Sequence, residues 1–191
     1  MTNPRPLVVF ALEMESCGLF DQYDVLHTGV GKTQAGYNLT KQIHKKRPGI
    51  VVNLGSAGSA VHKAGSVVAC RQFIQRDMDV TPLGFERYAT PFVDRPAMLE
   101  YGQTIPHYPQ AVCGTGDNFE TAHSGELYDV VDMEAYVLAH ICEQEDIPFL
   151  CLKYISDGAD GAAADNWEKA LEDGARKLRA ALDTSLNAGG S

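Results

Sequence analysis

Three acidic residues stand where acid–base chemistry is possible, each soon after an apolar run. Glu15 follows the run at residues 7–10, Asp157 follows the run at residues 149–155, and Glu134 follows a shorter one. A pair of carboxyl groups can supply one proton donor and one base. A single carboxylate can also accept hydrogen bonds from two neighbouring hydroxyls. Each position has a structural alternative, because such a carboxylate can equally cap a helix or face solvent.

Two short glycine turns accompany these acids. The turn GVGKT at residues 29–33 is similar to a phosphate-binding loop, but Leu26 replaces the glycine that such a loop needs five residues before Gly31. We therefore predict a tight strand-to-helix turn there. The turn NLGSAG at residues 53–58 is built of small residues, so a ligand could approach its backbone, and Ser56 could donate a hydrogen bond. Its structural alternative is a strand end that needs a positive φ.

The elements that must position these residues alternate between strands and helices. Short apolar runs with β-branched residues predict strands, and apolar residues at helical spacing predict helices. The predicted strands cover residues 7–10, 23–27, 50–54, 66–70, 111–113 and 149–155; the predicted helices cover residues 32–47, 134–145 and a stretch that begins near Asp165. Residues 81–108 contain several prolines and predict a long irregular loop.

This order of elements predicts a single α/β domain over residues 1–191, with a frayed end at residues 186–191. Nearly continuous apolar strands fit a sheet that is covered on both faces, so we expect a central mixed, mostly parallel sheet flanked by helices. Ligands of such sheets bind outside the carboxyl ends of the strands. Glu15 and Asp157 both follow strands, and we expect them at that edge.

Composition limits the class of protein. The chain has 191 residues and a net charge of −9, which argues against a nucleic-acid binder, because such proteins carry a basic face. Its five cysteines form no CxxC pair, so neither a zinc site nor a disulfide framework is predicted. No basic and apolar leader opens the sequence, and no run approaches the roughly 18 apolar residues that cross a bilayer. We expect a cytoplasmic protein that needs no metal or cofactor and has no nucleic-acid or membrane partner.

Seven short motifs follow one another along nearly the whole chain. They are ALEME (residues 11–15), GVGK (29–32), NLGSAG (53–58), DMDVTPLG (77–84), TGDNF (115–119), DMEA (132–135) and ISD (155–157). Together and in this order they resemble the purine nucleoside phosphorylase and nucleosidase superfamily. The similarity is greatest to the nucleosidases that act on 5′-methylthioadenosine and S-adenosylhomocysteine. The resemblance implies a three-layer nucleoside phosphorylase-like fold and a purine nucleoside as the substrate.

The resemblance also implies a role for individual residues. Asp157 corresponds to the general acid that protonates N7 of the departing purine, and Glu15 to the base that activates the attacking water. Protonation makes the purine a better leaving group, and positioned acid catalysis is worth about 10²–10⁴ in rate. Water then attacks an oxocarbenium-like ribosyl centre. This step is similar to glycoside hydrolysis by paired carboxylates. The residues implied for substrate binding are Glu134 and Met133 (ribose), Ser56 (ribose and water), Phe119 (stacking on the base), Lys153 and Ser156.

The sequence favours hydrolysis over phosphorolysis. Phosphorylases that the chain resembles carry an arginine just before the Gly-Ser turn, to hold phosphate, and this chain has Asn53 there. Neither Arg nor Lys occurs between Pro6 and His27, where another phosphate ligand would be expected. The acid at Asp157 favours a purine, because pyrimidine phosphorylases of the superfamily lack it. The predicted activity is release of free base from an adenine nucleoside, with 5′-methylthioadenosine or S-adenosylhomocysteine as the leading substrates.

Two departures and several alternatives accompany this prediction. Only residues 16–28 separate ALEME from GVGK, where the superfamily usually has extra strands, so we expect a smaller sheet with an incomplete barrel-like part. Lys153 stands where the nucleosidases often have Arg. We expect residues 84–109 to shape the 5′ end of the pocket, and a homodimer. The alternatives are a phosphorylase, a nucleosidase for another modified purine nucleoside of futalosine or adenosyl-lipid type, and a non-catalytic nucleoside-binding protein.

Overall fold

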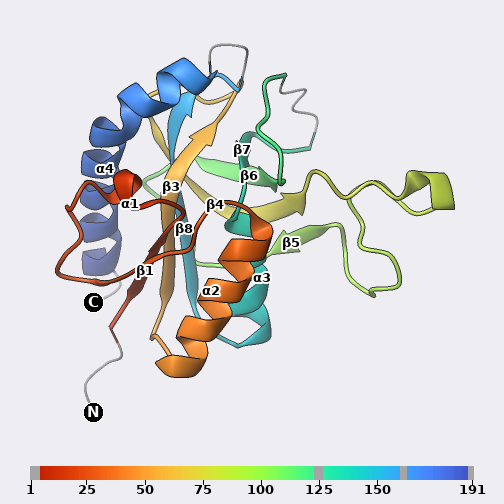
Figure 1. Cartoon of the computed structure of the whole chain (residues 1–191), viewed down its shortest axis with the longest axis horizontal. Helices are drawn as coiled ribbons and strands as arrows, with labels where there is room; N and C mark the ends of the chain where they lie inside the picture. Colours follow the sequence, from red (N-terminus) through yellow and green to blue (C-terminus); the bar gives the residue numbers. More distant parts are fainter. Residues whose placement is uncertain (1–4, 123–126, 160–162, 189–191) are drawn as a thin grey trace.

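Within the described residues, eight strands form one sheet at the centre of the molecule, and helices lie on both of its faces (Figure 1). The computed structural model describes residues 5–122, 127–159 and 163–188, with side chains in the last stretch from 170 to 186. The strands are β1 (Leu7–Phe10), β2 (Asp24–His27), β3 (Val51–Gly58), β4 (Val67–Gln75), β5 (Met98–Glu100), β6 (Gln110–Thr115), β7 (Val130–Asp132) and β8 (Phe149–Asp157). The helices are α1 (Glu13–Ser16), α2 (Lys32–Lys45), α3 (Ala135–Gln144) and α4 (Ala163–Ala188), with a short 3₁₀ turn at Thr81–Leu83.

The strand pairing closes part of the sheet into a ring. β3 pairs with β8, β8 with β4, β4 with β6, β6 with β7, and β7 with β3 again, so five strands form a small barrel. β1 and β2 extend the sheet beside β3, and β5 lies at the edge of β4. Most of these pairs are parallel, which confirms the predicted mixed sheet. The expected incomplete barrel is wrong, because the shortened segment lies between α1 and β2, outside the ring.

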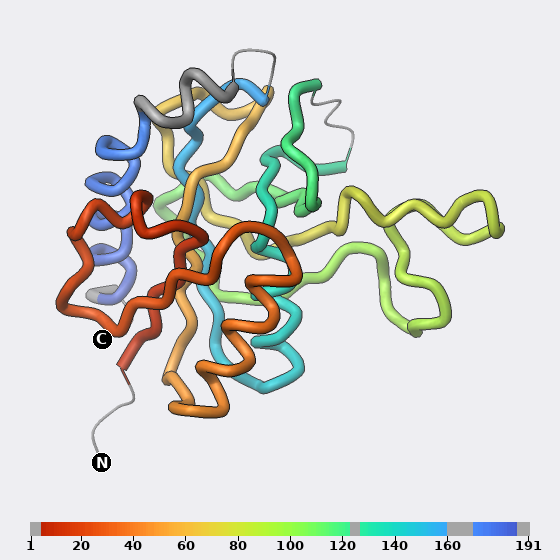
Figure 2. Tube along the Cα trace, viewed as in Figure 1, coloured from red at the N-terminus to blue at the C-terminus, as the bar shows by residue number. Residues whose placement is uncertain are grey.

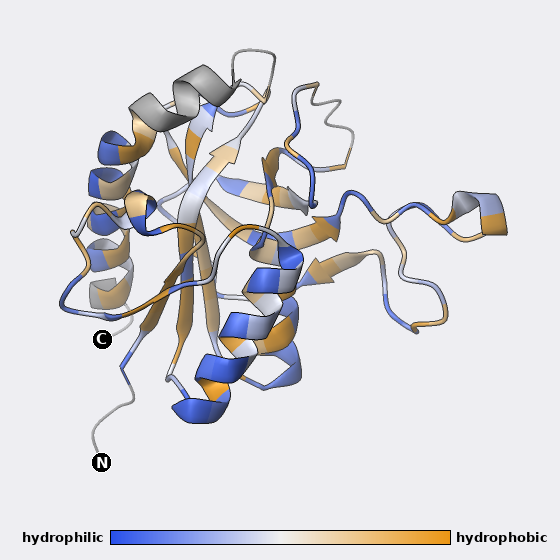
Figure 3. Ribbon diagram, in the orientation of Figure 1, coloured by the Kyte–Doolittle hydropathy of each residue, from blue (hydrophilic) through white to orange (hydrophobic). Residues whose placement is uncertain are grey.

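The two faces of the sheet have separate hydrophobic cores. Val8 and Phe10 of β1 point to the face that α4 covers with Leu178 and Leu182. Their neighbours along the strand point to the opposite face, which α2 and α3 cover. Figure 3 shows the strands as an apolar centre between helices whose outer surfaces are hydrophilic. This three-layer arrangement explains why β1 and β8 are nearly continuous apolar runs, since both faces of these two strands are buried.

Several predicted boundaries change in the structure. Strand β4 continues to Gln75, well beyond the predicted residues 66–70, because residues 71–75 include three polar side chains and carry a weaker apolar signal. Strand β5 lies inside the predicted loop, at the edge of the sheet, and it is too short for a periodic pattern. Helix α4 runs through Ala188, so part of the predicted frayed end is helical. Residues 189–191 lie outside the described part, as does the side chain of Asp165, near which the last helix was predicted to begin.

Residues 79–97, called the arm below, connect β4 to β5 and project away from the sheet (Figure 2). The arm carries large apolar side chains on its surface: Phe92 is 94% exposed and Leu83 is 73% exposed. Phe85 packs edge-on against Phe92, with ring centroids 5.1 Å apart. Apolar groups exposed in this way commonly mark a surface that another molecule covers. None of the described helices has the length and hydrophobicity that a membrane-spanning segment requires.

Candidate active site

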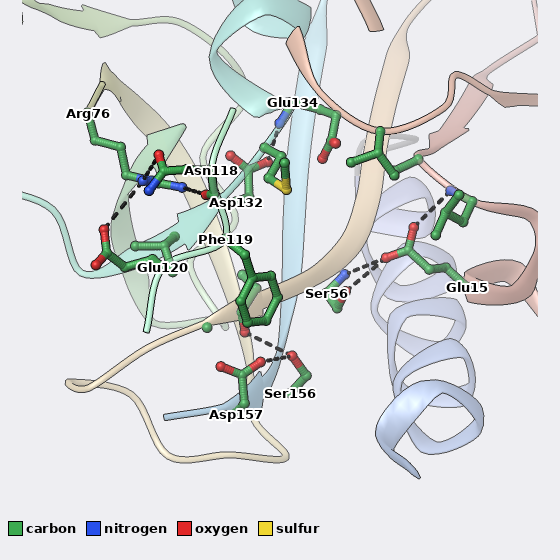
Figure 4. A pocket seen from close by; sticks show the side chains of 17 residues that line it. Glu15, Ser56, Arg76, Asn118, Phe119, Glu120, Asp132, Glu134, Ser156 and Asp157 are labelled. Carbon is green, nitrogen blue, oxygen red and sulfur yellow. Dashed lines mark hydrogen bonds and ion pairs between the residues drawn. The ribbon is translucent and has the colours of Figure 1, made fainter. Parts of the chain in front are cut away.

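A cavity of about 270 Å³ opens at the edge of the sheet where β3, β7 and β8 end (Figure 4). All three acids that the sequence singled out line it, together with Met133, Ser56, Phe119 and Ser156. The described lining residues are Ala11, Leu12, Glu15, Val30, Ser56, Ala57, Gly58, Arg76, Asn118, Phe119, Glu120, Val131, Asp132, Met133, Glu134, Ser156 and Asp157. Segments far apart in the sequence therefore converge at the predicted edge.

Glu15 is held in a cradle of hydrogen-bond donors. Its Oε1 accepts bonds from the Ser56 N–H at 3.1 Å and the Ser56 Oγ at 2.9 Å, and its Oε2 accepts one from the Leu12 N–H at 3.0 Å. The short helix α1 places the side chain over the end of β3, and Glu15 is buried. Three donors fix the orientation of the carboxylate and leave lone pairs on it for a further donor, such as a water molecule. This geometry suits a general base.

Asp157 and Ser156 form the opposite wall of the cavity, at the end of β8. The Ser156 Oγ donates to Asp157 Oδ2 at 2.6 Å, and the Ala159 N–H donates to Oδ1 at 2.8 Å. Gly58 on β3 allows this close packing, since a Cβ there would lie 2.7 Å from Asp157 Oδ1. Asp157 is buried, so its carboxyl group lies at a nearly dry surface where a proton could be passed to a ligand.

Glu134 stands at the N-terminus of α3 and faces the cavity from a third side. Its Oε1 accepts a hydrogen bond from the Gly31 N–H at 2.8 Å, which links α3 to the GVGK turn. Burial, followed by the nearby charge of Asp132, raises the pKa of Glu134 to about 7. Gly29 and Gly31 both have positive φ, at 80° and 90°, which confirms the predicted tight turn.

Behind Glu134 lies a buried ion pair that the sequence did not reveal. Lys153 on β8 bonds to Asp132 Oδ2 at 2.8 Å, and both side chains are almost fully buried. Asp132 also caps α3 by accepting the Ala135 N–H at 2.8 Å. Burial acts to raise the pKa of Asp132, but the Lys153 charge outweighs it and holds that pKa below its usual range. Lys153 is not among the cavity-lining residues; the structure places this predicted substrate contact one layer deeper.

Arg76 lines the cavity, although the sequence analysis did not single it out. It follows β4, and its side chain is 4% exposed. The guanidinium donates to the backbone oxygens of Gly116 and Asn118, to the Asn118 side chain at 2.8 Å, and to Glu120 Oε2 at 3.3 Å. These bonds hold the loop that carries Phe119 over the cavity. Arg76 was not predicted because the residues of β4 before it contain no local pattern that indicates a position at the cavity.

Three other motif residues, Lys32, Asp77 and Asp117, bond to one another and do not line the cavity. Lys32 Nζ lies 2.6 Å from Asp77 Oδ1, and the Lys32 N–H donates to Asp117 Oδ1 at 2.7 Å. The Asp117 N–H in turn donates to Asp77 Oδ2 at 2.8 Å. GVGK, DMDVTPLG and TGDNF are thus tied together, which identifies a structural role for these residues of the three motifs.

The arm does not reach the cavity of its own chain. None of the described lining residues comes from residues 84–109, so the expectation that this segment shapes the pocket is wrong for a single chain. Nor do the described residues contain a group of three His, Cys, Asp or Glu side chains placed to hold a metal ion. The ionisable side chains among the described lining residues are Glu15, Arg76, Glu120, Asp132, Glu134 and Asp157.

Comparison with known proteins agrees with this arrangement. The family model described as the phosphorylase superfamily matches residues 21–187. The chain belongs to the phosphorylase superfamily.

Its curated relatives include the 5′-methylthioadenosine/S-adenosylhomocysteine nucleosidases of an Exiguobacterium species and of Haemophilus influenzae. The first is 31% identical over 173 residues, covering 79% of this chain and 74% of the relative. The second is 28% identical over 167 residues, covering 77% and 73%. Within the superfamily, the chain lies in the nucleosidase branch.

Solved structures of superfamily members share the fold. The 5′-methylthioadenosine/S-adenosylhomocysteine nucleosidase of Helicobacter pylori gives a TM-score of 0.84 at 19% identity, covering 96% of this chain and 100% of that one. The futalosine hydrolase of the same organism gives a TM-score of 0.82 at 19% identity, covering 95% and 98%. These neighbours confirm the predicted three-layer fold.

Asn53 takes a structural place in this member of the superfamily. Its Nδ2 donates to the Val9 oxygen at 3.3 Å, and the Cys151 thiol donates to its Oδ1 at 3.4 Å. The side chain is buried between strands and does not line the cavity. All five cysteines are free thiols, and four of them are buried.

Proposed function

We propose that the chain is a purine nucleosidase that hydrolyses the N-glycosidic bond of an adenine nucleoside, such as 5′-methylthioadenosine or S-adenosylhomocysteine. The observation that carries the proposal is the convergence of Glu15, Glu134 and Asp157 on one cavity. Membership in the nucleosidase branch supports the reaction class, and the names of the relatives supply the two candidate substrates.

In the proposed reaction, each carboxyl group acts at a different atom. Asp157 donates its proton to N7, so that the purine leaves as a neutral base when the bond between N9 and C1′ breaks. Glu134 accepts hydrogen bonds from the 2′ and 3′ hydroxyls of the ribose. Glu15, oriented by Ser56, takes a proton from a water molecule whose oxygen bonds to C1′. The proton lost by Asp157 is balanced by the one that Glu15 gains, and solvent returns both groups to their starting state.

The surroundings of Glu15 favour water over phosphate as the nucleophile. Phosphate is an anion, and a carboxylate already occupies the Ser56 donors that could otherwise hold it. Among the described lining residues Arg76 is the only cation, and its Nη1 and Nη2 donors are bonded to the loop at residues 116–120. A phosphate at this position would meet charge repulsion without a compensating hydrogen bond.

The test is release of free base by the purified protein from a panel of purine nucleosides, with and without phosphate. Asp157→Asn should lower the turnover of 5′-methylthioadenosine by at least about 10²-fold, since it removes the proton donor. Calorimetry should still detect binding of the nucleoside to that variant. Asp21→Asn, a matched change at an exposed aspartate, should keep normal turnover. Near-normal turnover by Asp157→Asn would contradict the mechanism, and a strict requirement for phosphate would establish a phosphorylase instead.

We further propose that the chain acts in the cytoplasm as a homodimer, with the arm as the contact surface. The exposed Phe92 and Leu83 support a partner for the arm, and a second copy could place the arm beside the cavity that its own chain leaves open. The five free thiols suit a reducing compartment. The acidic net charge supports a small-molecule substrate over a nucleic acid.

A further inference from the structure

Three charged residues that do not line the cavity form a closed ring of hydrogen bonds beside it. Lys32 Nζ donates to Asp77 Oδ1 at 2.6 Å, and the Asp117 N–H donates to Asp77 Oδ2 at 2.8 Å. The Lys32 N–H closes the ring by donating to Asp117 Oδ1 at 2.7 Å. The three residues belong to three different sequence motifs, and the proposed mechanism uses none of them.

The ring connects two walls of the cavity. Gly31, which precedes Lys32, donates its N–H to Glu134 Oε1 at 2.8 Å. Asp117 stands two residues before Phe119, which lines the cavity. The ring therefore joins the turn that contacts the proposed ribose-binding carboxylate to the loop that carries the proposed base-stacking side chain.

Asp117 provides a cap that helix α2 lacks in its own sequence. The first N–H groups of a helix have no partner within the helix, and the side chain of the N-cap residue usually accepts one of them. The N-cap of α2 is Gly31, which has no side chain. Asp117 accepts the Lys32 N–H instead, and its negative charge suits the positive end of the helix dipole.

Asp117 is fixed from two sides. On one side it packs closely on the turn, since a Cβ at Gly31 would lie 3.0 Å from Asp117 Oδ1 and the φ of Gly31 is 90°. On the other side, Asp77 holds the backbone of Asp117. Burial acts to raise the pKa of Asp77, but the bonds from Lys32 and from the Asp117 N–H outweigh it and hold that pKa below its usual range. The anchor is therefore an ionised carboxylate.

We propose that Asp117 is a positioning residue, which holds the Gly31 N–H on Glu134 and so orients this carboxylate for the ribose hydroxyls. This role rests on the proposed nucleosidase function. Asp117 acts without touching the ligand: it fixes the N–H of Lys32, and with it the turn that ends there. Without Asp117 the turn loses its anchor, and Glu134 loses the backbone donor that holds its Oε1.

The first test is the pH dependence of kcat/KM for 5′-methylthioadenosine. Burial and Asp132 raise the pKa of Glu134 to about 7, whereas the Gly31 N–H acts to lower it. In Asp117→Ala the acid limb should therefore move to higher pH by up to about one unit, and kcat/KM at pH 7 should fall by about 10-fold. Asp117→Asn removes the charge but keeps an oxygen for the Lys32 N–H, so its limb should stay at the wild-type position. Both variants retain the charged groups that face Glu134 from β7, β8 and α1, which are Asp132, Lys153 and Glu15.

The second test measures binding without turnover, in the Asp157→Asn background. It compares adenosine with 2′,3′-dideoxyadenosine, which lacks both hydroxyls that Glu134 is proposed to bind. Calorimetry should show that Asp117→Ala lowers the preference for adenosine by about 10-fold, the value of one hydrogen bond, whereas Asp117→Asn keeps it. Asp77→Ala, which releases the backbone of Asp117, should act in the same direction as Asp117→Ala. Asp21→Ala, at an exposed aspartate outside the ring, should change neither the limb nor the preference.

Three results would overturn the proposal. The first is an unchanged preference for adenosine in Asp117→Ala. The second is an equal loss of affinity for both ligands, which would mean that Asp117 only stabilises the fold. The third is an equal effect of Asp117→Asn and Asp117→Ala, which would assign the effect to the charge and not to the hydrogen bond. The binding comparison does not depend on catalysis, so a failure of the Asp117 assignment is distinguishable from a failure of the proposed hydrolysis.

Discussion

At the residue scale, three carboxyl groups in one cavity differ in what surrounds them. Glu15 accepts hydrogen bonds from three donors, whereas Asp157 accepts one from the Ser156 hydroxyl and one from the Ala159 N–H. Glu134 accepts one backbone donor and is the group whose pKa burial shifts to about 7. The different neighbours of the three acids thus support their different proposed roles.

The raised pKa of Glu134 predicts a pH dependence. A carboxylate accepts bonds from both ribose hydroxyls, and protonation removes part of this acceptor capacity. As pH falls through about 7, Glu134 gains its proton, so kcat/KM should decline on the acid side with an apparent pKa near that value. The profile of kcat/KM from pH 5 to 9 tests this.

Two variants complete that experiment. Glu134→Gln should lower kcat/KM by about 10- to 100-fold, as expected for loss of charge-assisted hydrogen bonds, and should abolish the acid limb near pH 7. Glu13→Gln, at the exposed acid two residues before Glu15, should leave the limb in place. An acid limb that persists in Glu134→Gln belongs to another group, and the assignment to Glu134 would then fail.

At the element scale, the N-terminus of α3 is the most constrained part of the site. Asp132 caps the helix and pairs with Lys153, and Thr115 Oγ1 donates to Asp132 Oδ1 at 2.5 Å while accepting the Tyr136 N–H at 2.9 Å. The network joins β6, β7, β8 and α3 directly behind Glu134. The position of this acid therefore depends on the assembly of four elements.

Removal of the buried cation should be costly. Lys153→Met leaves Asp132 buried without its counter-charge, so we expect the free energy of unfolding to fall by about 3–5 kcal/mol. Urea unfolding monitored by circular dichroism measures this. Arg176→Met breaks an exposed pair with Glu172 and should cost less than about 1 kcal/mol. If both variants lost the same free energy of unfolding, the buried pair would contribute no more to stability than the exposed pair, and the prediction would be wrong.

At the scale of the whole molecule, the protein has two distinct parts, the sheet with its ring of five strands and the projecting arm. β3 and β8 pair along their whole length and end beside each other at the cavity. The arm leaves the sheet between β4 and β5 and projects away from it (Figure 2), and its Phe92 and Leu83 are exposed. The single chain thus presents a formed cavity and a separate apolar surface.

The arm predicts the behaviour of the protein in solution. Phe92→Asp should convert the proposed dimer to a monomer, because a charge at the centre of an apolar contact loses its hydration. Sedimentation equilibrium measures the mass directly. Val61→Asp, at an exposed apolar residue outside the arm, should remain dimeric. A wild-type protein that sediments as a 20.7 kDa monomer would exclude the homodimer.

The sequence by itself determined the longer strands and helices, though not β5 or α1, and it selected the acids at their ends. Strand and helix signals are local, because apolar periodicity depends on residues a few positions apart. For that reason the predicted helix at residues 134–145 agrees with α3 within one residue at each end. Residue types also carry chemistry without coordinates, so Glu15, Glu134 and Asp157 could be selected from their motifs.

Only the tertiary structure decided which residues meet. Arg76 and Glu120 are 44 positions apart, and Glu15 and Ser56 are 41 positions apart. Such contacts depend on which strands pair in the sheet, and local patterns do not encode that pairing. Lys153 did carry a sequence signal, since a lysine within an apolar strand needs an acidic partner, but its pairing with Asp132 follows only from the approach of β7 and β8 on either side of β3. The candidate acidic residues were therefore predictable from local patterns. The contact between Arg76 and Glu120 at the cavity and the closure of the barrel arise instead from long-range packing.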